Sequence, residues 1–155
     1  MTARFPVYSG LKTAVLNGQD ATLVSSVRYA KFDQTDIPSG FGVSSTNGYQ
    51  FVLDSGSSYI LIGSTSMKGG TVSFQWYNET TSANIGFKGN LRSGSSQNSL
   101  NPQYRKEAVA YIASSGSSIT VSLRITTDAG SPDFAFEPQF SSNSGIPILQ
   151  IIKKA

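Results

Sequence analysis

Residues 107–126 read EAVAYIASSGSSITVSLRIT and contain two kinds of β-strand on either side of one turn. From Ile119 to Thr126 apolar and polar side chains alternate, which is typical of a strand with one buried face and one solvated face. Residues 108–113 are almost entirely apolar, so both faces of that strand are apolar. The Ser-Gly-Ser cluster at 115–117 provides the turn.

The same two patterns recur along the chain, separated by clusters rich in Gly, Asn and Ser, while helical periodicity is nearly absent. This spacing predicts an all-β protein, a two-sheet sandwich of eight to ten antiparallel strands. The strands with one apolar face are 49–53, 71–77 and 118–126; those with two are 59–62, 108–113 and 148–152; further strands are expected at 22–32, 83–88 and, more weakly, around Phe134, Phe136 and Phe140.

A strand that is apolar on both faces needs protein packed against each face, and a two-layer sandwich packs protein against only one. Self-association would cover the second face. The alternative is that a loop or the N-terminal segment shields a central strand. Residues 1–20 are predicted to form an extended arm ahead of a domain at 21–155, and residues 89–106 a long polar loop. Loops longer than about 12–15 residues are usually functional or disordered.

Composition excludes much of the chemistry that enzymes use. The chain has 155 residues, only 14% of them charged, and contains neither cysteine nor histidine. The commonest general base and metal ligand are therefore missing, as are thiol nucleophiles and disulfides. Hydrophobic residues make up 38% of the chain, which argues against disorder, and about a quarter of the positions are Ser or Thr.

No catalytic or metal-binding constellation stands out. The one close acidic pair is Asp33 and Asp36, which suits a turn better than calcium, an ion that takes about six to eight oxygen ligands. A glycosidase pair separated in sequence stays open. The twelve basic residues are scattered rather than clustered, and no apolar run approaches the roughly 20 residues of a membrane span. We therefore expect no enzyme, no cofactor or metal, and neither nucleic acid nor membrane as a partner.

Aromatic residues allow two interpretations. Trp76-Tyr77 and Tyr49 with Phe51 could form a sugar-stacking platform on a sheet face. Large rings more often belong to a core or an interface, because each buries about 150–250 Å².

The order of the strands resembles the trimeric jelly-roll family of tumour necrosis factor and the complement globular heads. Residues 59–62 (YILI), 107–111 (EAVAY) and 149–153 (LQIIK) are similar to its third, sixth and last strands, and residues 71–78 (TVSFQWYN) to its next hairpin strand. In that family the third, sixth and last strands share the inner sheet around the threefold axis. The strands that are apolar on both faces occupy these places. The resemblance thus implies a homotrimer, with Tyr59, Tyr111 and Ile151 expected at the trimer seam.

Small, histidine-free versions of this family resemble bacteriophage particle proteins. Such proteins serve as capsid cement proteins or as fibre heads, and a short arm suits docking onto a capsid lattice. We therefore expect a structural protein on the virion capsid surface, made in the host cytoplasm: a trimeric decoration or cement protein that stabilises the shell by bridging capsomers. Its partners would be itself and the major capsid protein, docked through Arg4, Phe5 and Tyr8 of the arm. The alternative is a receptor- or glycan-binding head of a tail fibre that uses the 89–106 loop.

Overall fold

A computed structural model describes residues 10–65, 67–98, 104–114, 116–134 and 148–154. Within these residues the chain forms strands and one short 3-10 helix, η1 (Gln34–Asp36). The strands are β1 (Leu11–Val24), β2 (Val27–Phe32), β3 (Val43–Ser44), β4 (Gln50–Leu53), β5 (Ser57–Gly63), β6 (Lys68–Asn78), β7 (Ala83–Asn98), β8 (Tyr104–Lys106), β9 (Ala108–Ser114), β10 (Ile119–Ala129) and β11 (Ile148–Lys154).

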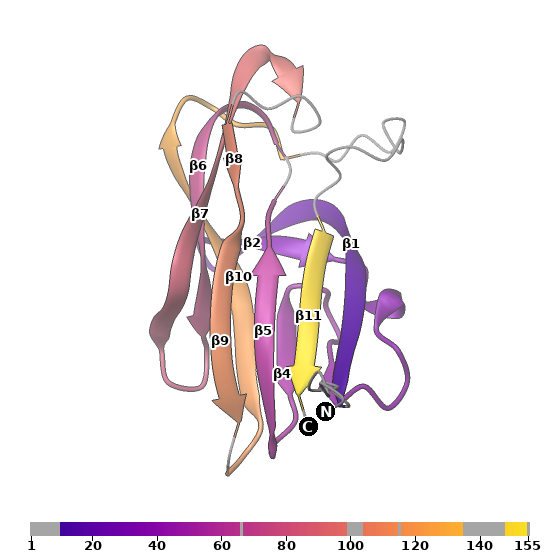
Figure 1. Ribbon diagram of the computed structural model, residues 1–155. Helices are drawn as coiled ribbons and strands as arrows, with labels where there is room; N and C mark the ends of the chain where they lie inside the picture. The colour runs from indigo at the N-terminus through magenta and orange to yellow at the C-terminus, as the bar shows by residue number, and fades with distance from the viewer. Residues whose placement is uncertain (1–9, 66, 99–103, 115, 135–147, 155) are drawn as a thin grey trace, which may run out of the picture.

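The strands form two layers, and all their pairings are antiparallel (Figure 1). We call the layer with the order β1-β11-β5-β9-β7 the inner sheet. The outer sheet runs β8-β7-β6-β10, with β2 and β4 along the other side of β10 and β3 beside β4. β1 and β7 pair in both sheets, which joins the layers at their sides. The predicted jelly-roll sandwich is confirmed.

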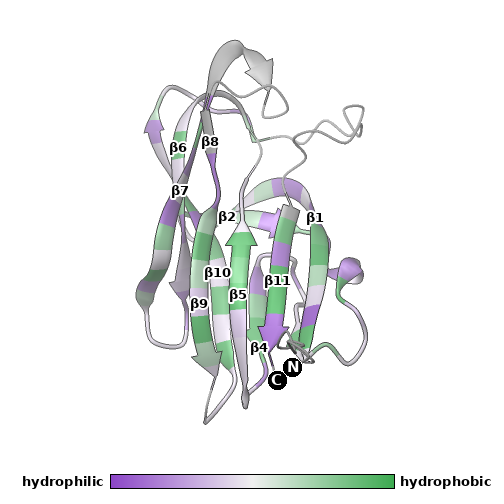
Figure 2. Ribbon diagram, in the orientation of Figure 1, coloured by the Kyte–Doolittle hydropathy of each residue, from purple (hydrophilic) through white to green (hydrophobic). Residues whose placement is uncertain are grey.

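The two strand patterns separate into the two layers. The three strands that are apolar on both faces, β5, β9 and β11, are neighbours in the inner sheet. The three with a single apolar face, β4, β6 and β10, are neighbours in the outer sheet. In Figure 2, β5 is coloured as hydrophobic over much of its length.

Large side chains fill the space between the sheets. Trp76, Phe74 and Leu123 of the outer sheet and Tyr59 and Leu61 of the inner sheet are all buried. The Trp76 indole Nε1 donates a hydrogen bond to the Ala108 carbonyl at 3.2 Å, which ties β6 to β9 across the core. A buried indole N–H needs such a partner, so this contact fixes how the layers face each other.

Glycine permits the closest approach between strands at the side of the sandwich. Gly86 has a φ of +70°, and a Cβ at this position would collide with the Val109 carbonyl oxygen and with Ala110. Only glycine combines this backbone conformation with that contact. It thereby allows β7 to turn from the outer sheet toward β9.

Three predicted boundaries are wrong. Residues 11–20, assigned to the arm, form the first part of β1 and pair with β11 and β2. Most of the 89–106 loop is also strand, since 89–98 continue β7 and 104–106 form β8. Segment 22–32 is two strands, with Ser25 and Ser26 turning at positive φ. In the first two cases pairing with neighbouring strands overrides a polar, turn-rich sequence, whereas in the third a tight turn divides the expected strand. Phe134 is buried, whereas Phe136 and Phe140 lie outside the described residues.

Candidate functional site

The inner sheet carries apolar side chains on the face that points away from the core. In a strand, alternate residues share a face, so the antiparallel register places them in rows across the sheet. One row is Val15, Gln150, Ile62, Val109 and Phe87. The next row is Thr13, Ile152, Ile60 and Tyr111. A third row is Leu11, Lys154, Ser58 and Ala113. We call this surface the apolar face.

Several of these side chains are strongly exposed. Phe87 is 77% exposed, Tyr111 66%, Val15 50%, Leu11 49% and Ile60 37%. Single exposed apolar residues are ordinary on protein surfaces, but here they lie on adjacent strands of one sheet. The apolar face therefore has the character of an interface.

A hollow of about 360 Å³ indents the apolar face. Its lining includes Leu11, Ile60, Tyr111, Ile152 and Lys154. The Tyr111 hydroxyl donates to Ser58 Oγ at 3.3 Å, and Ser58 also lines the hollow. A side chain from a second molecule could insert here, between aliphatic walls and a tyrosine ring.

The structure places the three predicted seam residues on two different faces. Tyr111 lies on the apolar face, but Tyr59 and Ile151 are fully buried in the core between the sheets. The prediction for these two was wrong by one position, because Ile60 and Ile152 on the same strands occupy the outward rows. Phe87 and Val15 also belong to this surface. Phe87 is paired with Val109 and Val15 with Gln150, and it is this strand register that places them there. The predicted arm residues Arg4, Phe5 and Tyr8 lie outside the described residues.

Tyr59 instead anchors a loop at the end of the sandwich. Its hydroxyl lies 3.0 Å from the Gly42 carbonyl oxygen and 3.2 Å from the Asp54 carbonyl oxygen, and the two acceptors share its single donor hydrogen. Beside it, Lys153 Nζ donates to the Phe41 carbonyl at 2.9 Å. Burial raises the pKa of Tyr59, and the Asp54 carboxylate raises it further. These contacts hold the segment before β3 against the last strand.

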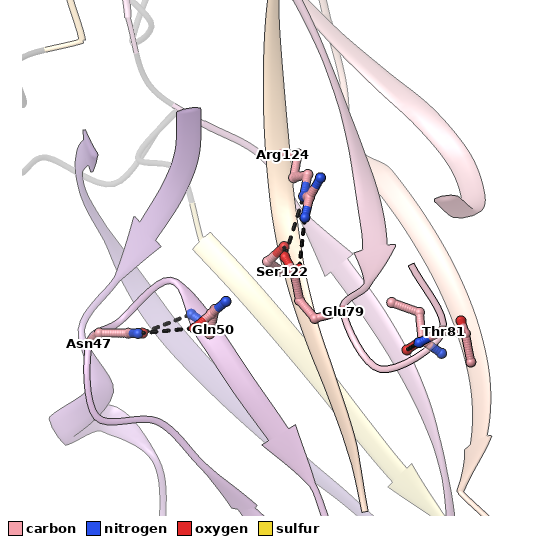
Figure 3. Close-up of polar contacts among 7 residues, drawn as sticks. Asn47, Gln50, Glu79, Thr81, Ser122 and Arg124 are labelled. Carbon is pink, nitrogen blue, oxygen red and sulfur yellow. Dashed lines mark hydrogen bonds and ion pairs between the residues drawn. The ribbon is translucent and has the colours of Figure 1, made fainter. Parts of the chain in front are cut away.

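The outer sheet presents a polar cluster on its solvent side (Figure 3). Glu79 Oε1 accepts hydrogen bonds from Ser122 Oγ at 2.6 Å and Arg124 Nε at 3.3 Å, and Oε2 accepts one from the Arg124 guanidinium at 2.7 Å. The guanidinium carbon lies 3.4 Å from the centroid of the Tyr77 ring, a cation–π contact. Farther along, the Tyr29 and Tyr49 rings are 4.9 Å apart.

The proposed sugar-stacking set is divided between the core and this surface. Trp76 and Phe51 are buried in the core, whereas Tyr77 and Tyr49 are partly exposed on the outer sheet. Trp76 and Phe51 therefore cannot stack on a ligand at the surface.

The described residues contain no group of three or more acidic side chains placed to hold a metal ion. No helix among them is long and apolar enough to cross a membrane.

Comparison with known proteins identifies the fold. No protein-family model matches the sequence, and no curated protein matches it. Crystal structures of murine APRIL at pH 5.0 and pH 8.0 do match the structure, both with a TM-score of 0.54. They share 15% and 13% of residues with this chain, and each match covers 92% of this chain and 99% of the APRIL chain. APRIL is a jelly-roll protein of the tumour necrosis factor family. The chain therefore has a jelly-roll fold like that of tumour necrosis factor.

Proposed function

We propose that the chain is a non-enzymatic structural protein of a bacteriophage particle, a homotrimer that decorates the capsid surface and bridges neighbouring capsomers. The apolar face supports the self-association that this proposal requires. A surface that exposes Phe87, Tyr111 and Val15 on one sheet is stabilised when other protein covers it.

A second copy of the chain is the occupant that suits the apolar face best. The face is formed by strands of a rigid sheet, so it can pack without the ordering cost that a mobile loop incurs. Around a threefold axis, each copy would present the same face, and the ring would close without leaving an open end. The resemblance to trimeric jelly rolls, in which the same strands surround the axis, supports three copies.

The composition of the chain is compatible with a structural subunit of a larger assembly. With 14% charged residues and many hydroxyl side chains, the chain has few groups that would be costly to bury in contacts with neighbouring subunits. The first and last described strands pair at Leu11 and Lys154, in the third row of the apolar face. In this proposal the arm residues Arg4, Phe5 and Tyr8 add contacts to the capsid near that pair.

The alternative is a binding head that uses residues 89–106 as a recognition loop, but most of these residues form strands. Residues 89–98 are strand and pair with β6, and residues 90–92 also pair with β8. A recognition site in this segment would therefore be built largely on paired strands rather than on a long loop.

Localisation in the virus particle tests the proposal. A density map of the virus particle that the proposal assigns to this chain should show trimeric jelly rolls over the junctions between capsomers. Density at the tip of a tail fibre would instead favour a receptor-binding head, and absence from the particle would overturn the proposal.

A further inference from the structure

A polar hollow of about 250 Å³ lies on the solvent side of the outer sheet, on the opposite side of the sandwich from the apolar face. Its walls come from β6, β7 and β10, and include Ser73, Gln75, Tyr77, Lys88, Arg124 and Thr126. Because the self-association surface lies on the other sheet, this hollow would stay open to solvent in the proposed oligomer.

Arg124 is held in place before any ligand arrives. Glu79 accepts from its Nε and from one terminal nitrogen, and the Tyr77 ring lies against the guanidinium. Ser122, which is fully buried, fixes Glu79 in turn by donating to Oε1 at 2.6 Å. A guanidinium has five N–H donors, and the contact with Glu79 uses two of them. The remaining donors are available to a ligand in the hollow.

Both charged side chains that line the hollow are cations. Lys88 is exposed, and its ammonium group forms no ion pair with another described residue. Two carboxylates lie nearby without lining the hollow: Glu79, which pairs with Arg124, and Asp128, which accepts a hydrogen bond from Ser73 Oγ at 3.1 Å. Gln75 donates to the Gly86 carbonyl at 3.1 Å, so its side-chain oxygen can still accept. The hollow thus offers the Lys88 ammonium and the Arg124 guanidinium together with hydroxyl and amide groups.

We propose that this hollow binds an acidic saccharide. The sugar carboxylate would accept hydrogen bonds from Arg124 and Lys88, and charge-assisted bonds of this kind are the stronger ones. The ring hydroxyls would pair with Ser73, Gln75 and Thr126. Three such sites in one oligomer would strengthen binding to a polysaccharide or a glycan-coated surface through effective concentration. The site is independent of the capsid proposal, since it requires only the single-chain fold.

A titration of the 155-residue chain with 3′-sialyllactose tests this site, and lactose, which lacks the acidic sugar, is the neutral control. We expect sialyllactose at up to about 10 mM to shift backbone amide NMR signals of residues 73–77, 86–88 and 122–126, and lactose to leave them in place. The proposal is overturned by the absence of shifts, by shifts confined to other surfaces, or by an equal response to lactose.

A matched pair of variants separates the site from general charge attraction. Lys88→Gln removes one cation from the hollow, and Lys12→Gln removes one exposed cation from β1. Losing a single exposed charge contact should weaken sialyllactose binding about fivefold in Lys88→Gln. Binding by Lys12→Gln should equal that of the unmodified chain. Equal weakening in both variants would show attraction to net charge and would overturn the site.

Discussion

Ile60 of β5 and Tyr111 of β9 are directly opposite each other in the antiparallel register, and both side chains are exposed, by 37% and 66%. Cross-strand pairs of this kind stabilise a sheet by packing against each other and against a cover. Here the pair lacks a cover within the described chain, although β5 and β9 are central strands of their sheet. A central strand pair with an uncovered apolar face is the reason to expect a second copy.

Tyr111→Asp should dissociate the oligomer without unfolding the chain. The substitution places a charge in the middle of the apolar face, where an unpaired buried carboxylate is very costly. Because Tyr111 is 66% exposed in the single chain, the fold itself should tolerate the change. Analytical ultracentrifugation should show a monomer, and circular dichroism an intact β-sheet signal.

Ser44→Asp is the matched control, since it adds the same charge to an exposed position on β3 in the outer sheet. It should sediment like the unmodified chain. If Tyr111→Asp and Ser44→Asp give the same mass, the apolar face does not mediate association.

Deletion of residues 2–9 tests the arm. These residues precede β1 and include Arg4, Phe5 and Tyr8. The shortened chain should keep its oligomeric state, because the apolar face lies within the described strands, but it should fail to bind particles that lack the protein. Unchanged co-sedimentation with particles would dispose of arm docking.

Trp76→Phe should destabilise the fold by about 2 kcal/mol or more. It removes the hydrogen bond to the Ala108 carbonyl and leaves a void beside fully buried neighbours. Denaturant unfolding followed by circular dichroism measures the loss. Tyr77→Phe, next along the strand but on the solvent side, keeps its ring beneath Arg124 and should cost far less. A similar loss in both variants would contradict the assignment of Trp76 as the tie between the sheets.

Tyr59→Phe should flatten the loss of stability at alkaline pH. Burial raises the pKa of Tyr59 in the folded chain, so its contribution is fully present below the unfolded value of about 10 and is lost as pH rises through the folded value. The variant lacks this group, and at neutral pH it should be about 1 kcal/mol less stable because two carbonyl contacts are lost. Unfolding curves at pH about 8 and 11 give the comparison. An identical alkaline loss in both proteins would show that Tyr59 does not contribute.

The layer arrangement was predictable from residue alternation. Ile119, Val121, Leu123 and Ile125 follow a period of two, and the strands that are apolar on both faces proved to be neighbours in one sheet. Alternation does not say which of two apolar faces points inward, and for this reason Tyr59 and Ile151 were assigned to the wrong side. Their orientation depends on what lies across the core, such as the close approach of Gly63 to the Trp76 ring.

Residues 89–98 show a case in which the sequence pattern predicts the wrong secondary structure. Their Ser, Gly and Asn content indicates a loop, but backbone hydrogen bonding to β6 makes them strand, with Leu91 as a fully buried anchor. The outer-sheet cluster was likewise beyond prediction. Glu79 and Arg124 are 45 positions apart, and only the register of β6 with β10 brings them together.

The mass of the 155-residue chain in solution tests self-association most directly. Light scattering coupled to size-exclusion chromatography at tens of micromolar should give three times the 16.5 kDa mass of one chain. A mass of one chain at that concentration would contradict the account, because the exposed Phe87, Tyr111 and Ile60 would then remain uncovered.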